Sequence, residues 1–121
     1  MEKRRILLID DEKGLTRLVK MALPQYEIRE ENDPTQALET ARDFRPHLIL
    51  LDVVMPVLDG GDVAGLFKAD PMFEKVPIVF LTAIVTPKAD QAEQSIGGYP
   101  FIAKPVSREK LIQCIEQHLA V

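Results

Sequence analysis

Short runs of apolar residues that do not alternate with polar ones recur along this chain. The clearest runs occupy residues 6–9, 47–51 and 78–81. A strand with one face in water alternates apolar and polar residues, whereas a strand of a parallel sheet is buried on both faces and is apolar throughout. These runs therefore predict a central parallel sheet, to which residues 26–29 and 100–103 add a second and a fifth strand along the chain.

Between the runs, apolar residues recur every three or four positions, which is the spacing of amphipathic helices. The predicted apolar faces are Leu15, Leu18, Val19 and Ala22; Ala37, Leu38 and Ala41; and Leu111, Ile112, Ile115 and Leu119. Strands that alternate with helices in this way specify an α/β fold, in which helices cover both faces of the sheet. We predict one α/β domain over residues 1–121.

Capping residues mark several helix boundaries. Asp33 followed by Pro34 is typical of an N-cap with a proline in the first turn. Ser107, three residues before Lys110, predicts the start of the last helix. A fourth helix is expected at residues 86–96, and we predict that it is short because the sequence there is polar and leads into two glycines.

Size and charge narrow the class of protein. The chain has 121 residues, of which 46% are hydrophobic and 28% are charged, and this suits one globular domain with one core. Its formal net charge of -4 argues against a nucleic-acid surface, which would need clustered Lys and Arg. No apolar run approaches the roughly 20 residues that a membrane span needs. We therefore expect a cytoplasmic protein with no direct contact to nucleic acid or membrane.

Polar residues suited to chemistry follow the predicted strands. In a parallel sheet, ligands bind at the edge formed by the carboxyl ends of the strands. The residues at those ends are Asp10 and Asp11 after the first strand, Asp52 after the third, Thr82 after the fourth and Lys104 after the fifth. Residues far apart in the sequence are thus expected to meet at one edge, although each alone is typical of an ordinary turn, strand end or loop.

Three carboxylates in one partly dry cleft, those of Asp10, Asp11 and Asp52, would repel one another unless a cation lay among them. All the ligands that converge there are oxygen atoms, and this set favours Mg²⁺ over zinc or copper. A carboxylate can attack phosphorus to form an aspartyl phosphate if the growing charge is neutralised, which Lys104 and the metal can do. The Thr82 hydroxyl can donate a hydrogen bond to the phosphoryl group, a contact that exists only after phosphorylation.

Four segments carry a resemblance to a known family. Residues 6–12 read Ile-Leu-Leu-Ile-Asp-Asp-Glu, and residues 50–60 place Met-Pro and then Asp-Gly at fixed distances after Asp52. Residues 77–83 end in Leu-Thr-Ala, and residues 101–105 end in Lys-Pro. With these motifs the whole chain resembles the receiver domain of two-component response regulators. The resemblance implies a single-domain, doubly wound (βα)5 sandwich with a flavodoxin-like, five-stranded parallel sheet of strand order 2-1-3-4-5.

The resemblance also implies a role for each residue of the site. Asp52 is the phosphoacceptor, and Lys104 pairs with its phosphoryl group. Asp11 and Asp52 bind Mg²⁺ directly together with the backbone carbonyl of Val54, while Asp10 contributes through water. These assignments make Mg²⁺ the expected cofactor.

Signalling and partners follow from the same resemblance. It assigns the switch to Thr82 and Phe101, whose ring turns inward as the threonine moves toward the phosphoryl group. The donor is expected to be a histidine kinase, a phosphotransfer protein or a small phosphodonor, and the altered surface is expected to bind a downstream effector protein or domain. Such a protein assists its own phosphorylation and dephosphorylation but is not a turnover enzyme.

Two alternatives stay open from the sequence. One is a receiver-like interaction module that works without phosphorylation, although the acids, the threonine and the lysine of the site are all present. The other is a phosphatase or phosphotransferase with an aspartate nucleophile, of the haloacid-dehalogenase type. Those enzymes carry Asp-x-Asp after the first strand, and Asp10 followed directly by Asp11 lacks that spacing.

Overall fold

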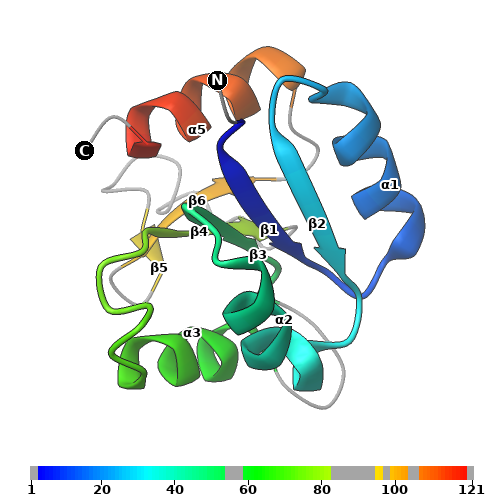
Figure 1. The fold of residues 1–121 in the computed structure, drawn as a ribbon. Helices are drawn as coiled ribbons and strands as arrows, with labels where there is room; N and C mark the ends of the chain where they lie inside the picture. Colours follow the sequence, from blue (N-terminus) through cyan, green and yellow to red (C-terminus); the bar gives the residue numbers. More distant parts are fainter. Residues whose placement is uncertain (1–2, 54–58, 83–94, 97–98, 104–106, 120–121) are drawn as a thin grey trace.

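The computed structural model describes residues 3–53, 59–82, 95–96, 99–103 and 107–119, and contains a sheet with helices on both faces (Figure 1). The strands are β1 (Arg5–Ile9), β2 (Glu27–Glu31), β3 (Leu48–Leu51), β4 (Ile78–Thr82), β5 (Ser95–Ile96) and β6 (Tyr99–Ala103). The helices are α1 (Lys13–Ala22), the 3-10 turn η1 (Pro34–Gln36), α2 (Ala37–Phe44), α3 (Gly60–Ala69) and α5 (Arg108–Leu119). The predicted α/β fold is confirmed.

Five parallel strands stand in the order β2-β1-β3-β4-β6. Because β6 is the fifth parallel strand along the chain, this is the predicted order 2-1-3-4-5, which is also confirmed. Ile9 of β1 lies opposite Leu51 of β3, and Leu51 lies opposite Phe80 of β4. This register brings the carboxyl ends of the three central strands to nearly the same level.

A short sixth strand corrects the sequence prediction at the edge of the sheet. β5 pairs antiparallel with β6, with Ser95 opposite Pro100 and Ile96 opposite Tyr99. The predicted fourth helix is therefore wrong in its last two residues, and residues 86–94 lie outside the described part of the chain. The open edge of β6 offers backbone partners to Ser95 and Ile96, and the polar pattern of the sequence does not reveal such partners.

Two apolar clusters fill the two faces of the sheet, because successive residues of a strand point to opposite sides. In β1, Leu7 and Ile9 pack with α2 and α3, whereas Ile6 and Leu8 pack with α1 and α5. The predicted apolar faces of α2 and α5 are confirmed: Ala37, Ala41, Leu111 and Ile115 are buried, and Leu38, Ile112 and Leu119 pack against the clusters. Each large buried side chain contributes about 1.5–3 kcal/mol, so the sheet is a firm support for residues at its edge.

Helix α1 is rotated relative to the prediction. Of its predicted face, Val19 is buried and Leu15 is half-buried, but Leu18 is 66% exposed and Ala22 is also exposed. Thr16 is fully buried instead, and its hydroxyl is held by side chains from the end of β2. The prediction is wrong for Leu18 and Ala22 because apolar spacing alone cannot weigh a buried hydrogen bond against the burial of a leucine.

Both predicted helix caps are confirmed. The Asp33 carboxylate accepts from the N–H of Thr35 at 3.0 Å, and the Ser107 hydroxyl accepts from the N–H of Lys110 at 3.1 Å. Hydrogen bonds from the hydroxyl and the N–H of Thr35 hold the pKa of Asp33 below its ordinary value. In the described part of the chain, no helix has both the length and the apolar character needed to span a membrane.

Candidate functional site

The carboxyl ends of β1 and β3 bring three carboxylates together. Asp10 follows β1 and Asp52 follows β3, and the N–H of Asp52 donates to the carbonyl of Ile9 at 2.9 Å, which continues the pairing of the two strands to their ends. One carboxylate oxygen from each of Asp10, Asp11 and Asp52 lies within 4.8 Å of the other two. Asp10 and Asp52 are only 1% and 4% exposed, and Asp11 is half-buried. The three acids that the sequence predicts at this edge therefore lie together.

Three carboxylates at this separation interact unfavourably when all are charged. Two like charges about 4 Å apart repel by about 1 kcal/mol in bulk water and by about 4 kcal/mol at the effective dielectric constant near a protein surface. Salt and water screen buried charges less than exposed ones, and Asp10 and Asp52 are buried. The cluster can hold a divalent cation, whose charge would offset this repulsion.

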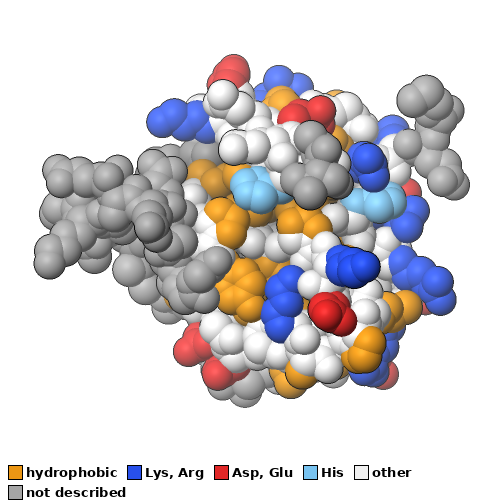
Figure 2. Space-filling view, turned by 90° about the vertical axis from the view of Figure 1, so that its left-hand side faces the viewer, with side chains coloured by type: hydrophobic (Ala, Val, Ile, Leu, Met, Phe, Trp, Pro, Cys, Tyr) orange, Lys and Arg blue, Asp and Glu red, His pale blue; other side chains and the backbone are white. Residues whose placement is uncertain are grey.

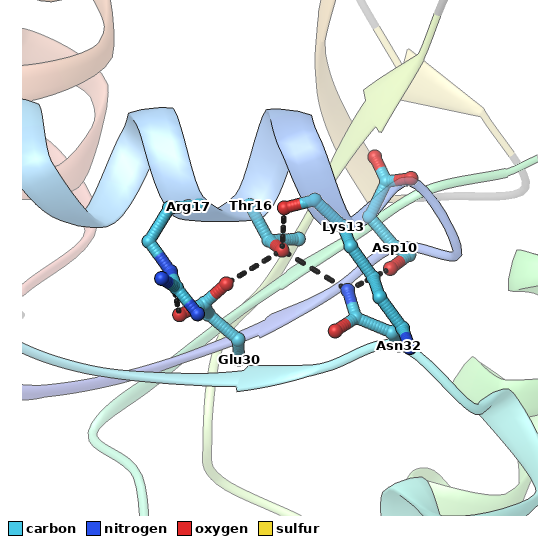
Figure 3. A network of polar contacts seen from close by, with 6 residues as sticks. All are labelled: Asp10, Lys13, Thr16, Arg17, Glu30 and Asn32. Atoms are coloured by element: carbon cyan, nitrogen blue, oxygen red, sulfur yellow. Dashed lines mark hydrogen bonds and ion pairs between the residues drawn. The ribbon is translucent and has the colours of Figure 1, made fainter.

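Residues from α1 and from the end of β2 hold the turn that carries Asp10 and Asp11 (Figure 3). The side-chain amide of Asn32 donates to the Asp10 carbonyl at 2.8 Å and to the Thr16 hydroxyl at 3.0 Å. The N–H of Glu12 donates to Asp10 Oδ1 at 3.0 Å. The sequence did not predict that Asn32 and Thr16 contact the acidic turn. The one indication in the sequence was a threonine among the apolar positions of the first helix.

The start of α3 packs directly against the backbone of Asp52. The N–H of Gly60 donates to the Val53 carbonyl at 2.8 Å, and a Cβ at Gly60 would lie 2.4 Å from the Asp52 carbonyl oxygen. Only glycine allows so close an approach. Asp59 and Asp62 form a capping box at the same helix end. The first residue of α3 therefore packs against the backbone of the predicted phosphoacceptor. The Asp-Gly motif in the sequence does not reveal this contact.

The predicted residues on the later strands are placed only in part. Thr82 is the last residue of β4 and pairs with β6, so its backbone reaches the same edge of the sheet. Lys104 and Val54 lie outside the described residues. Phe101 of β6 is 8% exposed and lies opposite Phe80 of β4 in the apolar core. The roles assigned to Thr82, Phe101, Lys104 and Val54 stay predictions.

Histidine does not join the acidic cluster, whose members are all aspartates within the described residues. Figure 2 shows a face on which two histidine side chains lie beside hydrophobic ones, with both signs of charge around them. His47 precedes β3 and is separated from Asp52 by about 16 Å of extended chain. Its Nδ1 accepts from the N–H of Arg5 at 2.9 Å. The cluster therefore offers carboxylate oxygens to a metal, as the sequence predicts.

Comparison with known proteins decides the family. A sequence model of the response regulator receiver domain matches residues 6–116. This chain belongs to the response regulator receiver family. Receiver domains serve two-component signalling and are not turnover enzymes, so the assignment replaces the dehalogenase-like alternative.

Solved receiver structures share the fold over nearly the whole chain. Chemotaxis protein CheY4 of Vibrio cholerae is 25% identical with a TM-score of 0.83, and the match covers 96% of this chain and 98% of that one. The receiver domain of the sensor histidine kinase PA1611 of Pseudomonas aeruginosa is 26% identical with a TM-score of 0.84, and the match covers 98% of this chain and 99% of that one. That receiver was crystallised with a magnesium ion coordinated in its active site cleft.

Curated relatives of this receiver are longer proteins. The DNA-binding response regulator MtrA of Mycobacterium tuberculosis is 32% identical over 123 residues, which cover 97% of this chain and 51% of MtrA. A probable cyclic di-GMP phosphodiesterase of Vibrio cholerae is 32% identical over 115 residues, which cover 94% of this chain and 26% of that protein. The chain thus spans a quarter to a half of the length of these relatives.

Proposed function

We propose that this receiver is phosphorylated on Asp52 in a Mg²⁺-dependent reaction. The donor is a histidine kinase, a phosphotransfer protein or a small phosphodonor, and the product switches a surface that binds a downstream effector protein or domain. The observation that carries the proposal is the group of three carboxylate oxygens within 4.8 Å, with Asp52 almost fully buried. Buried like charges at a strand edge do not stabilise a fold, so their presence points to a function.

The residues of the cluster fit Mg²⁺. This ion prefers oxygen ligands in an octahedral arrangement and keeps several waters, so a few carboxylates suffice. Asp11 and Asp52 would hold it together with the backbone carbonyl of Val54, and Asp10 would contribute through water. When bound, the ion neutralises negative charge on the phosphoryl oxygens. The magnesium ion in the PA1611 receiver domain supports the same assignment here.

The chain's own residues carry out the transfer. A carboxylate oxygen of Asp52 forms a bond to phosphorus while the bond from phosphorus to the donor's nitrogen or oxygen breaks, and the leaving atom keeps that electron pair. The Lys104 ammonium group pairs with the phosphoryl oxygens, and the Thr82 hydroxyl donates a hydrogen bond to one of them. Gly60 supports the Asp52 backbone from behind, which keeps the attacking carboxylate in a defined position.

The switch uses Thr82 and Phe101. A hydrogen bond from Thr82 to the phosphoryl group exists only in the phosphorylated state, so it biases the receiver between two surface arrangements. Phe101 lies in β6 opposite Phe80 of β4, the strand that ends in Thr82. A movement of Thr82 can therefore reach the Phe101 ring through the pairing of these two strands.

Exposed apolar side chains mark a surface for the phosphodonor protein. Leu18 and Met21 of α1 are 66% and 70% exposed, and a separation of three residues places them on the same side of the helix. Helix α1 begins at Lys13, directly after the turn that carries Asp11. A partner that binds this side of α1 would contact the helix that directly follows the acidic turn.

Mass spectrometry tests the proposed function. The purified protein is incubated with acetyl phosphate or phosphoramidate and Mg²⁺, beside an Asp52→Asn variant. We expect a Mg²⁺-dependent gain of about 80 Da, one phosphoryl group, in the unaltered chain only. A gain that persists in Asp52→Asn would place the modification on another residue. No gain with these donors or with a cognate kinase would favour the interaction module that works without phosphorylation.

A further inference from the structure

A series of polar contacts links the acidic turn to the protein surface between α1 and β2 (Figure 3). The Asn32 amide donates to the Asp10 carbonyl at 2.8 Å and to the Thr16 hydroxyl at 3.0 Å. That hydroxyl lies 2.8 Å from Glu30 Oε1, to which it can donate. At the outer end, Arg17 Nε lies 3.4 Å from Glu30 Oε2. We call this series the Asn32 network.

Burial along the Asn32 network is greatest at Thr16. The side chain of Arg17 is 70% exposed and that of Glu30 is 14% exposed, whereas Thr16 is fully buried. A buried hydroxyl needs partners inside the protein, and Thr16 has them in Asn32, in Glu30 and in the carbonyl of Lys13 at 3.1 Å. Loss of a contact therefore matters most at Thr16, where water cannot replace it.

Asn32, at the inner end of the network, contacts the peptide unit between Asp10 and Asp11. Asn32 fixes the Asp10 carbonyl, the N–H of Asp10 donates to the carbonyl of Glu31 at 3.1 Å, and Asp10 Oδ1 accepts from the N–H of Glu12. With this peptide plane held, both aspartate side chains start from defined directions. The two carboxylates can then meet in the cluster without a search through other turn conformations.

We propose that Asn32 and Thr16 are positioning residues of the Mg²⁺ site, because they hold the turn that carries Asp10 and Asp11 in the orientation that metal binding requires. This inference rests on the proposed function, since it concerns the affinity of the same site. Mg²⁺ demands near-ideal octahedral geometry, so a small change in the direction of a ligand weakens binding. Groups that hold metal ligands by hydrogen bonds, without contacting the metal themselves, typically contribute a factor of about 10 to 100 to the affinity for the metal.

The test compares variants that break the Asn32 network with a matched control. Thr16→Val removes the hydroxyl at nearly constant volume, and Thr16→Ser restores it. Asn32→Ala removes the amide at a half-buried position, where the fold tolerates a smaller side chain more easily. Thr40→Val is the control, because the Thr40 hydroxyl also donates to a carboxylate at the end of β2, that of Glu31, but belongs to a separate contact. Calorimetric titration of the metal-free proteins with Mg²⁺ gives the affinities.

The expected result is weaker Mg²⁺ binding, by about tenfold, in Thr16→Val and Asn32→Ala. Thr16→Ser and Thr40→Val are expected to bind Mg²⁺ as the unaltered protein does. Equal affinity in all variants would overturn the inference. So would the same loss in Thr40→Val, because the effect would then come from general loosening of the fold.

A metal-free measurement separates this inference from the proposed function. Asp10 Oδ1 holds the N–H of Glu12, so hydrogen exchange of that amide, followed by NMR without Mg²⁺, reports the order of the turn. We expect faster exchange at Glu12 in Asn32→Ala and Thr16→Val but not in Thr40→Val. Unchanged exchange would overturn the positioning role. If the unaltered protein fails to bind Mg²⁺, the proposed function fails, and the exchange rates still decide whether the two residues position the turn.

Discussion

Gly60 at the start of α3 lies against the backbone of Asp52 so closely that a Cβ would stand 2.4 Å from the Asp52 carbonyl oxygen. The contact joins a helix N-terminus to the strand end that carries the proposed phosphoacceptor. Because backbone atoms on both sides are held by hydrogen bonds, neither can move away without loss of other contacts. The position of Asp52 therefore depends on the absence of a side chain at residue 60.

Alanine at Gly60 is expected to lower the free energy of unfolding by about 1–3 kcal/mol, because α3 or the Asp52 backbone must shift. Gly65→Ala is the matched control on the same helix, since a Cβ there meets nothing within 4 Å. It is expected to raise the free energy of unfolding by about 0.5–1 kcal/mol through helix propensity. Urea denaturation measures both changes, and changes of the same sign and size would contradict the close approach.

Magnesium is expected to stabilise the folded protein. A ligand that binds only the folded state at ten times its Kd adds about 1.4 kcal/mol to the free energy of unfolding. Asp52→Asn removes one of the three clustered charges, so most of this gain should disappear in the variant. Thermal or urea denaturation with and without Mg²⁺ measures the gain, with NaCl of equal ionic strength as the control. A full gain in Asp52→Asn would show that the cation binds elsewhere.

Alkaline stability depends on Tyr26. Burial raises the pKa of its phenol, and the hydrogen bond to the Glu116 carboxylate raises it further. The folded pKa lies above the ordinary value of 10.0. The contribution of the protonated Tyr26 phenol to the free energy of unfolding is therefore fully present below pH 10, and it is lost as the pH rises toward the folded pKa. Tyr26→Phe is therefore expected to lose less stability than the unaltered protein between about pH 10 and 11.

Urea denaturation across this pH range checks the prediction for Tyr26. Tyr99→Phe removes the other tyrosine hydroxyl and is expected to keep the full alkaline loss. If Tyr26→Phe showed the same alkaline loss as the unaltered protein, another group would be responsible for it.

Glutamate at both Leu18 and Met21 is expected to slow phosphorylation by a kinase or phosphotransfer protein by about tenfold or more. The reason is that burial of two such side chains against the donor protein contributes over about 1.4 kcal/mol to its binding free energy. Phosphorylation by acetyl phosphate should keep its rate, since the small donor needs no docking surface. Met72→Glu, at another exposed methionine, is the control. Phosphorylation kinetics with both donors measure the effect, and equal slowing with acetyl phosphate would mean that the substitutions disturb the cluster itself.

The sequence by itself was sufficient for the five parallel strands and for the acids at the edge of their sheet. A strand buried on both faces must be apolar throughout, so residues 6–9 and 47–51 can be identified as buried strands from the local sequence alone. Asp10 and Asp52 follow these runs directly, and parallel pairing of the two strands then has to bring them side by side. Local residues alone carry this information.

Only the tertiary structure decided the rotation of α1 and the need for glycine at residue 60, because both depend on groups from distant segments of the chain. Thr16 is buried and Leu18 faces water because Glu30 of β2 and Asn32, directly after β2, supply hydrogen bonds that set the rotation of α1. Gly60 must be glycine because the backbone of Asp52 lies against it. The rotation of a helix and the space at a residue are set by the groups that the fold brings near, and the chain around Thr16 or Gly60 does not contain those groups.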